Sequence, residues 1–271
     1  MMRRSRRPTI VLLGSAETLA GLDGRLRRAN VALRRVPVLE FHDAVPRRRP
    51  PWSVRPAGFD ILLVGSLRAV ERFVRTSLDP AAARGASVWA VGTVTARAMR
   101  RLGWRHVRAA PTAGVDALLA SLGPGRGRRL IYPRSDRAGP TAGDRLRARG
   151  WRVWDPVVYR TTARSALRPS ERRVVEGARA WIATSPSSLS ALRRLLGPAR
   201  FGRGRRTVPL IALGDRTLRA ARGHGFRHAE SADAATVQAL TYYVVRRFSD
   251  GTSARVRTVS VASTARPRRG A

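Results

Sequence analysis

The chain has 271 residues, 43% of them hydrophobic, and its 54 basic residues outnumber 17 acidic ones to give a formal net charge of +37. The absence of cysteine excludes disulfides, thiolate metal sites and iron–sulfur clusters, and the four histidines lack the spacing of a zinc site, so we expect no metal. No apolar run approaches the roughly 20 residues of a membrane span. A soluble protein that attracts polyanions is therefore expected, whether these are nucleic acids or metabolites with several carboxylates. All the basic residues are arginine, which is typical of a GC-rich coding bias as well as of selection for an anionic ligand.

Short β-branched runs alternate with amphipathic stretches along the chain, which is typical of βα units with parallel sheets. The predicted strands are TIVLL (9–13), DILLV (60–64), SVWAV (87–91), RLIY (129–132), RVWDPVVY (152–159), AWIAT (180–184) and VPLIAL (208–213). The clearest amphipathic stretches are RAVERFVRTSL (68–78) and TARAMRRLG (95–103). Segments rich in arginine, proline and glycine predict loops at 46–58, 123–129 and 197–206, and residues 249–271 predict a basic tail without regular structure.

The chain also repeats itself. GWRHV at 103–107 recurs as GFRHA at 225–229, an offset of 122 residues, and other segments match at offsets of about 120. This pattern predicts a tandem duplication, with one copy from about 8 to 122 and the other from about 128 to 245. Two similar domain-sized units place a ligand between them. The matched pairs include Gly92 with Gly214, Thr95 with Thr217, and His106 with His228, the two histidines being interpreted as structural.

Ligands of open parallel sheets bind beyond the carboxyl ends of the strands, where helix N-termini point backbone amides outward. Hydroxyl side chains follow several predicted strands there, and they are candidate contacts for carboxylates: Ser66, Thr93, Thr95, Thr184, Ser185, Ser187, Ser188 and Thr217. Glycine before two of these helices lets a ligand approach the backbone. Each hydroxyl has an alternative interpretation as an ordinary helix cap.

Two further candidates differ from these hydroxyls. Arg134, with Ser135 beside it, follows a strand in LIYPRSDRAG, where an arginine fork can grip a carboxylate; a solvated surface arginine is the alternative. Tyr159 is predicted to end a strand in DPVVYRTT, a position that suits a proton donor, and a buried structural tyrosine is the alternative. The chain has no phosphate-loop lysine, no dinucleotide fingerprint and no nucleophile elbow, which argues against nucleotide-dependent and hydrolytic chemistry.

These motifs together resemble a known family. A strand ending in Thr-Ser-Pro-Ser, the segment ALGDRTLRAARGHG with its first-half counterpart AVGTVTARAMRRLG, and LIYPRSDRAG followed by LRARGWRVWDPVVYRT are similar to uroporphyrinogen-III synthase over about residues 8–245. The resemblance implies an α/β fold with two similar doubly wound parallel-sheet domains, joined by two extended linkers near 37–42 and 157–164. The domains would be 1–38 plus 164–248, and 39–163 inserted between them, followed by the tail at 249–271.

The resemblance also implies a reaction. In this family hydroxymethylbilane, a linear tetrapyrrole with eight carboxylates, loses its terminal hydroxyl as water and closes through a spiro intermediate with inversion of ring D. No cofactor or metal is implied. Tyr159 would be the acid, and the hydroxyls at 95, 184, 185, 187 and 217 would contact carboxylates or backbone. We expect a cytoplasmic monomer, with hydroxymethylbilane synthase acting upstream and no contact with membranes.

Two stretches depart from the family pattern. Gly14-Ser15 stands where a Thr-Arg pair is usual, and Gly65-Ser66 stands for a pair of hydroxyl residues. These departures keep open the alternative of a non-catalytic module that binds a tetrapyrrole or another polyanion as a regulator. The arginine- and glycine-rich loops and tail keep open a second alternative, a nucleic-acid-binding protein.

Overall fold

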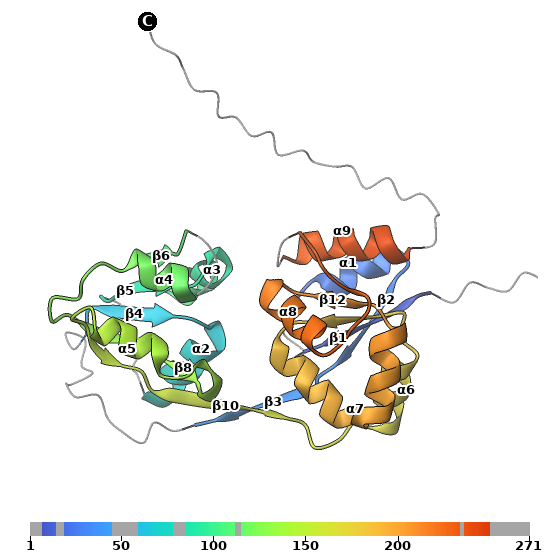
Figure 1. Ribbon diagram of the computed structural model, residues 1–271. Helices are drawn as coiled ribbons and strands as arrows, with labels where there is room; N and C mark the ends of the chain where they lie inside the picture. Colours follow the sequence, from blue (N-terminus) through green and yellow to red (C-terminus); the bar gives the residue numbers. More distant parts are fainter. Residues whose placement is uncertain are drawn as a thin grey trace, which may run out of the picture. The chain divides into compact units, whose positions relative to one another are not determined.

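The computed structural model describes residues 7–14, 19–44, 59–77, 85–111, 115–233 and 236–249. The chain divides into two compact units (Figure 1): unit 1 comprises residues 1–38 and 164–271, and unit 2 comprises residues 39–163. Both units are built on a parallel sheet, so the predicted α/β class is confirmed. The predicted loop at 46–58, Ser15 and, apart from Ser249, the predicted tail lie outside the described residues.

Unit 1 contains a five-stranded parallel sheet with the strand order β13-β12-β11-β1-β2. Its strands are β1 (Thr9–Leu13), β2 (Ala32–Val36), β11 (Ala180–Ala183), β12 (Leu210–Ala212) and β13 (Ala229–Ser231), and its helices are α1 (Leu22–Arg28), α6 (Pro169–Glu176), α7 (Pro186–Thr207), α8 (Asp215–Gly223) and α9 (Val237–Phe248). One face packs against α1 and α9 through a cluster that includes Leu26 and Val244. On the other face, Trp181 donates a hydrogen bond to the carbonyl of Val175 in α6. Burial on both faces explains why the central strands are continuous apolar runs.

Unit 2 contains a second five-stranded parallel sheet, with the order β6-β5-β4-β7-β9. Its strands are β4 (Ile61–Val64), β5 (Ser87–Ala90), β6 (Val107–Ala109), β7 (Arg129–Ile131) and β9 (Arg152–Trp154), and its helices are α2 (Leu67–Ser77), α3 (Thr93–Arg101), α4 (Val115–Ser121) and α5 (Thr141–Arg147). Phe73 of α2 and Met99 of α3 pack on one face. Leu118 of α4 and Leu146 of α5 pack on the other.

A small third sheet in unit 2 carries the strands that lead toward the boundary with unit 1. It has the order β3-β10-β8, formed by β3 (Leu39–Asp43), β10 (Val157–Ala163) and β8 (Arg134–Ser135), with a 3₁₀ turn, η1 (Asp136–Ala138), after β8. β3 and β10 are antiparallel. The predicted strand at 152–159 is therefore two strands, β9 and β10, separated at Asp155-Pro156, because proline has no N–H for a ladder. Tyr159 accordingly lies inside β10 and not at a strand end.

The sequence repeat and the compact units are out of phase. Matching the two sheet orders pairs β6 with β13, β5 with β12, β4 with β11, β7 with β1 and β9 with β2. The five-stranded sheet of unit 2 thus takes three strands from the first repeat and two from the second, and the sheet of unit 1 takes two from the first and three from the second. The expectation that each repeat forms a domain-sized unit of its own is therefore wrong, because the parallel pairing of β1 with β11 and of β4 with β7 joins strands from different repeats.

The predicted loop at 197–206 is also wrong, since most of it is helical. Gly197 has φ 75° and interrupts α7, and Pro198 begins a second helical segment directly after it. Phe201 is buried and packs edge-on against Phe226 with ring centroids 5.6 Å apart. Tertiary packing of this kind stabilises a helix whose arginine- and glycine-rich sequence does not favour one.

A buried carboxylate in the first turn of α6 links stability to pH. Glu171 accepts a hydrogen bond from the backbone N–H of Arg168 at 2.9 Å, and one oxygen accepts from the guanidinium groups of Arg168 and Arg164 at 2.8 and 3.1 Å. Burial raises the pKa of Glu171, but these hydrogen bonds lower it by a larger amount, and the resulting pKa is about 2. Because this folded-state pKa lies below the unfolded value of about 4.3, the stabilisation is complete above that value and is lost as the pH falls toward 2.

We expect Glu171→Gln to lower the free energy of unfolding at pH 7 by about 2 kcal/mol. The variant should also show a weaker loss of stability between pH 4.5 and 2 than the unsubstituted chain, measured by urea unfolding at several pH values. Glu176→Gln, which removes a partly exposed pair with Arg200, is the control and should change little. An unchanged pH dependence in Glu171→Gln would contradict the assignment.

Candidate active site

Apart from Tyr159, which lies inside β10, the sequence-predicted candidates lie at or near the carboxyl ends of parallel strands, and they divide between the two units. In unit 2 most of them follow β4, β5 and β7, and in unit 1 they follow the neighbouring strands β11 and β12. Unit 2 holds Ser66, Thr93, Thr95, Arg134, Ser135 and Tyr159. Unit 1 holds Thr184, Ser185, Ser187, Ser188 and Thr217.

Tyr159 is fixed by packing while its hydroxyl remains available. Its main chain pairs with Asp43 of β3 and with Ser135 of β8. The side chain, 8% exposed, packs edge-on against Phe41 with centroids 6.0 Å apart, and the guanidinium carbon of Arg72 lies 5.5 Å from the phenol centroid. Among the described residues none forms a hydrogen bond with the Tyr159 hydroxyl, and this oxygen is not fully enclosed. The hydroxyl can therefore bond to a ligand.

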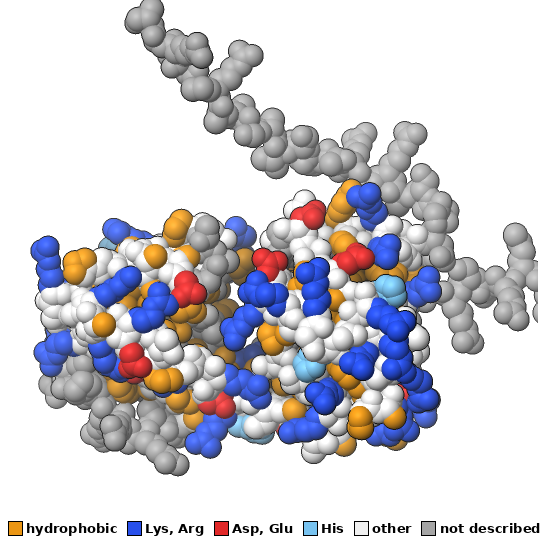
Figure 2. Space-filling model, in the orientation of Figure 1, with side chains coloured by type: hydrophobic (Ala, Val, Ile, Leu, Met, Phe, Trp, Pro, Cys, Tyr) orange, Lys and Arg blue, Asp and Glu red, His pale blue; other side chains and the backbone are white. Residues whose placement is uncertain are grey.

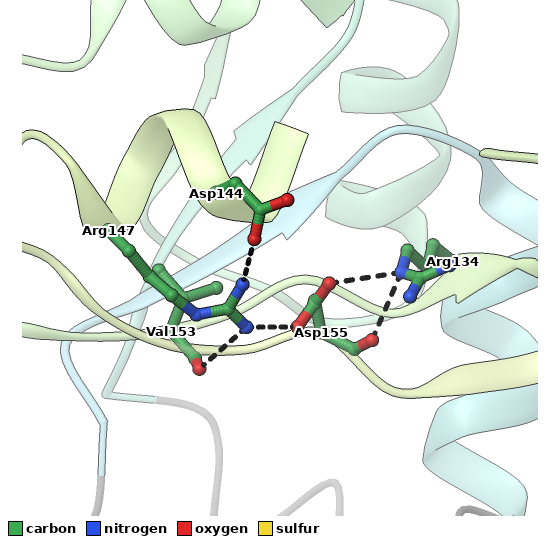
Figure 3. Close-up of polar contacts among 5 residues, drawn as sticks. All are labelled: Arg134, Asp144, Arg147, Val153 and Asp155. Carbon is green, nitrogen blue, oxygen red and sulfur yellow. Dashed lines mark hydrogen bonds and ion pairs between the residues drawn. The ribbon is translucent and has the colours of Figure 1, made fainter. Parts of the chain in front are cut away.

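Arg134 is oriented by a buried ion pair (Figure 3). Its Nε donates to Oδ2 of Asp155 at 3.1 Å and to the Asp155 carbonyl at 3.2 Å, and the two side chains are 14% and 11% exposed. The other carboxylate oxygen of Asp155 bonds to Arg147, which also bonds to Asp144 and to the carbonyl of Val153. No described residue bonds to the terminal nitrogens of Arg134, so these remain for an anion.

Tyr132 and Asp155 lie at the same edge but were not among the sequence-based candidates. Each directly follows a buried strand, β7 or β9, and that placement is the signal that could have identified them. Tyr132 is 3% exposed, and a Cβ atom built on Gly65 would lie 3.1 Å from its hydroxyl oxygen. Burial raises the pKa of the Tyr132 hydroxyl, so this group stays protonated at neutral pH.

The remaining hydroxyls of unit 2 lie at two helix starts. The carbonyl of Ser66 accepts hydrogen bonds from the first turn of α2, and α3 begins at Thr93. Thr93 is exposed and Thr95 is partly buried. No described residue bonds to the hydroxyls of these three side chains, so each is available beside the free amides of a helix N-terminus.

In unit 1, the start of α7 is an internally satisfied cap. The backbone N–H of Ser188 donates to Oγ of Ser185 at 3.2 Å, and the Ser188 hydroxyl donates to the Ser185 carbonyl at 2.7 Å. Ser188 is fully buried, so the capping interpretation applies to it. Thr184 donates its hydroxyl to the carbonyl of Leu13 at 3.3 Å. Ser187, which follows the proline of this turn, is partly exposed.

The matched glycines before α3 and α8 differ in conformation. Gly214 has φ 136°, which favours glycine, whereas Gly92 has φ 179°, an extended conformation that any residue adopts. Thr217 is 4% exposed, and its backbone N–H donates to the Gly214 carbonyl at 3.0 Å. The repeated Gly-x-x-Thr pattern therefore places Thr95 at a more accessible position than its counterpart Thr217.

The double role available to Ser185 can be tested. We expect Ser185→Ala to lower the free energy of unfolding by about 1 kcal/mol, because it removes the cap of α7. Ser185→Asp restores the cap, but its negative charge would repel an anionic ligand. If Ser185 also contacts a carboxylate, the aspartate variant will show recovered stability together with a raised KM. Ser190→Ala, further along α7 and exposed, is the control. A normal KM in Ser185→Asp would leave only the capping role.

The charge of the protein is distributed and not confined to one patch. Figure 2 shows arginine side chains over the visible surface of both units, with few acidic side chains between them. Within the described ranges, no group of three or more His, Asp or Glu side chains could hold a metal ion. No helix in this part of the chain has the length and apolar character needed to cross a membrane.

Comparison with known proteins gives a consistent result. A family model described as uroporphyrinogen-III synthase HemD matches residues 21–242. Uroporphyrinogen-III synthetase from Helicobacter pylori is 14% identical, with a TM-score of 0.60, over 89% of this chain and 99% of that chain. A mutant uroporphyrinogen III synthase from Thermus thermophilus is 16% identical, with a TM-score of 0.56, over the same shares. Because the sequence identities are this low, the two structural similarities establish only the fold of this chain. A search of curated proteins returned no significant match.

Proposed function

Because the chain belongs to the uroporphyrinogen-III synthase family, we propose that it converts hydroxymethylbilane into uroporphyrinogen III. The observation that carries this proposal is the family match, which extends over residues 21–242 and so includes strands and helices of both units. The alternatives of a non-catalytic regulator and a nucleic-acid-binding protein receive no support from the comparisons.

We assign Tyr159 as the acid that assists loss of water. In this step the phenol transfers its proton to the terminal hydroxyl of the bilane, the carbon–oxygen bond breaks, and the oxygen leaves as water. The lone pair of the adjacent pyrrole nitrogen replaces the lost bonding electrons, and loss of the pyrrole N–H proton restores the phenol. The packing of the ring against Phe41 and the absence of a described protein partner for its hydroxyl support this role. A positioned acid of this kind contributes about 100-fold or more to a rate.

We assign Arg134 and the hydroxyls of unit 2 to the substrate carboxylates. Arg134 is held at its Nε by Asp155 and can present its terminal nitrogens to an anion. Ser66, Thr93, Thr95 and Ser135 supply neutral donors, and helix N-termini favour negative charge. The hydroxyls of unit 1, at positions 184, 185, 187 and 217, are proposed as further contacts.

The main demand of this reaction is geometric. Ring D must be attacked at its substituted position to give the spiro intermediate, after which the bond to ring D breaks and re-forms with the ring inverted. A flexible bilane that is not held closes without inversion. Several fixed carboxylate contacts therefore accelerate the productive closure by reducing the entropy that must be lost on reaching it. We further propose that the chain acts as a cytoplasmic monomer on substrate released by hydroxymethylbilane synthase.

The proposal is tested by the isomer that forms. Freshly generated hydroxymethylbilane is incubated with the purified chain, the product is oxidised, and uroporphyrins I and III are separated by chromatography. Predominantly type III product is the expected result. Type I product alone from a folded sample would overturn the proposed activity and leave a binding protein with this fold.

A further inference from the structure

Unit 2 holds two of the four tyrosines of the chain, and the proposed reaction uses only one of them. Tyr132 follows β7 at the carboxyl edge of the sheet, where Ser66 and Arg134 also lie. Although the side chain is 3% exposed, no described residue forms a hydrogen bond with its hydroxyl. The oxygen is not one of the polar atoms that are fully enclosed without a partner, so it keeps contact with the surface. A hydroxyl that has no described protein partner and still reaches the surface at this edge can donate its hydrogen bond to a ligand that approaches the strand ends.

The strand registers show what Tyr132 replaces. In unit 2, β4 pairs with β7 so that Leu62 lies beside Ile131. In unit 1, β11 pairs with β1 so that Trp181 lies beside Val11. Continuing both registers by one residue makes Tyr132 the structural counterpart of Leu12, a fully buried core residue.

The neighbouring strand carries the complementary change. Beyond the carboxyl end of β11, unit 1 has Thr184, which brings a hydroxyl to the sheet edge. Beyond β4, the counterpart of Thr184 is Gly65, and the phenol of Tyr132 lies against it: a Cβ atom on Gly65 would be 3.1 Å from both the hydroxyl oxygen and Cε2 of Tyr132. At these two equivalent positions unit 1 thus has Leu12 and Thr184, whereas unit 2 has Tyr132 and Gly65. In both units one hydroxyl is retained, but in unit 2 it comes from the adjacent strand.

We propose that Tyr132 is a substrate-binding residue, whose hydroxyl donates a hydrogen bond to a carboxylate of the bilane from the space that a side chain at position 65 would otherwise occupy. This inference rests on the proposed function. It explains how an edge that lacks the usual hydroxyl at position 65 still offers one.

The surroundings of Tyr132 favour donation to an anion. Burial has the largest effect on its pKa and raises it; Asp155 and Tyr159 raise it further and Arg134 lowers it, with a net increase. The phenol therefore stays neutral at physiological pH and has a proton to donate, and hydrogen bonds from neutral donors to charged acceptors are among the stronger ones. Arg134 contributes positive charge at the same edge, so a carboxylate placed there gains both interactions.

The first test is Tyr132→Phe, which removes only the hydroxyl. We expect KM for hydroxymethylbilane to rise about tenfold, corresponding to about 1.4 kcal/mol, while kcat changes by less than about twofold. The melting temperature should not change, because the hydroxyl has no described protein partner. Tyr242→Phe, on an exposed side chain of α9, is the matched control and should leave KM unchanged. An unaltered KM in Tyr132→Phe, with type III product still formed, overturns the inference.

The second test moves the hydroxyl back to the other strand. Tyr132→Leu combined with Gly65→Thr rebuilds the pair of unit 1, and it should recover at least half of the kcat/KM lost in Tyr132→Leu alone. No recovery would overturn the assignment of the hydroxyl to this space. The unsubstituted chain distinguishes failure of the proposed function from failure of this inference. If it forms no type III isomer, the proposed function is wrong. If it forms type III product normally and Tyr132→Phe leaves KM unchanged, only the role of Tyr132 is refuted.

Discussion

Replacing Tyr159 with phenylalanine is expected to lower kcat for type III product by at least about 100-fold. The free energy of unfolding should stay within about 0.5 kcal/mol of the unsubstituted chain, because the ring keeps its contact with Phe41 and the hydroxyl has no described protein partner. The unassisted closure to type I does not need this acid. The product mixture should therefore shift toward type I as well as forming more slowly, which the chromatographic separation of isomers measures directly.

The control for Tyr159→Phe is again Tyr242→Phe, because Tyr242 is 51% exposed and lies on α9 of unit 1. A second comparison is with Tyr132→Phe, for which the expected effect is on KM. If Tyr159→Phe retains normal kcat, the assignment of the acid is wrong. An effect on KM alone would instead give Tyr159 a binding role.

Replacing Asp155 with alanine is expected to lower the free energy of unfolding by about 3 kcal/mol. The carboxylate is 11% exposed and bonds to both Arg134 and Arg147, so its removal leaves the buried guanidinium of Arg134 without a counter-charge. The same change removes the carboxylate that orients Arg134. We therefore expect kcat/KM to fall about tenfold, because the charged hydrogen bond proposed between Arg134 and a substrate carboxylate is lost. Urea unfolding and initial rates measure the two effects.

Asp144 provides a matched control for this prediction. It bonds to the same Arg147 (Figure 3), but its side chain is 61% exposed, so Asp144→Ala should cost less than about 1 kcal/mol. It should leave kcat/KM unchanged. Equal losses of stability in the two variants would show that burial of the ion pair does not determine its contribution.

The parts of the fold that could be predicted from sequence are those that depend on local pattern. The continuous apolar runs of β1, β4 and β11 identified central strands, because strands buried on both faces have no polar alternation. The helix at 197–206 was missed because Gly197 and Pro198 are local signals for a loop. Its stability comes from Phe201 and from contacts with Trp181, and these partners are not visible in the local sequence.

The site was predicted to a similar extent. Positions after strands suggested Arg134 and the hydroxyls as candidates, because the edge of a parallel sheet is set by strand order. Tyr159 was expected at a strand end but lies inside β10. The partner of Arg134 could not be predicted: with 54 arginines and 17 acidic residues, composition allows many pairings, and the choice of Asp155 depends on the register of β7 with β9. The contact of Tyr132 with Gly65 could not be predicted, because the glycine follows another strand of the sheet.

The out-of-phase arrangement of repeats and units affects how the chain must fold during synthesis. Strand β1 leaves the ribosome before unit 2, but one of its two neighbours, β11, is made only after the whole of unit 2. Unit 2 is continuous in sequence and can complete its sheet first. One side of β1, in contrast, has no strand to pair with until β11 is made, and its apolar side chains, which are buried in the folded protein, stay exposed until then. At about 5–20 residues per second this interval lasts roughly 10–30 s. Nascent chains stalled within unit 2 should therefore be the form of this protein most prone to aggregation and most dependent on chaperones.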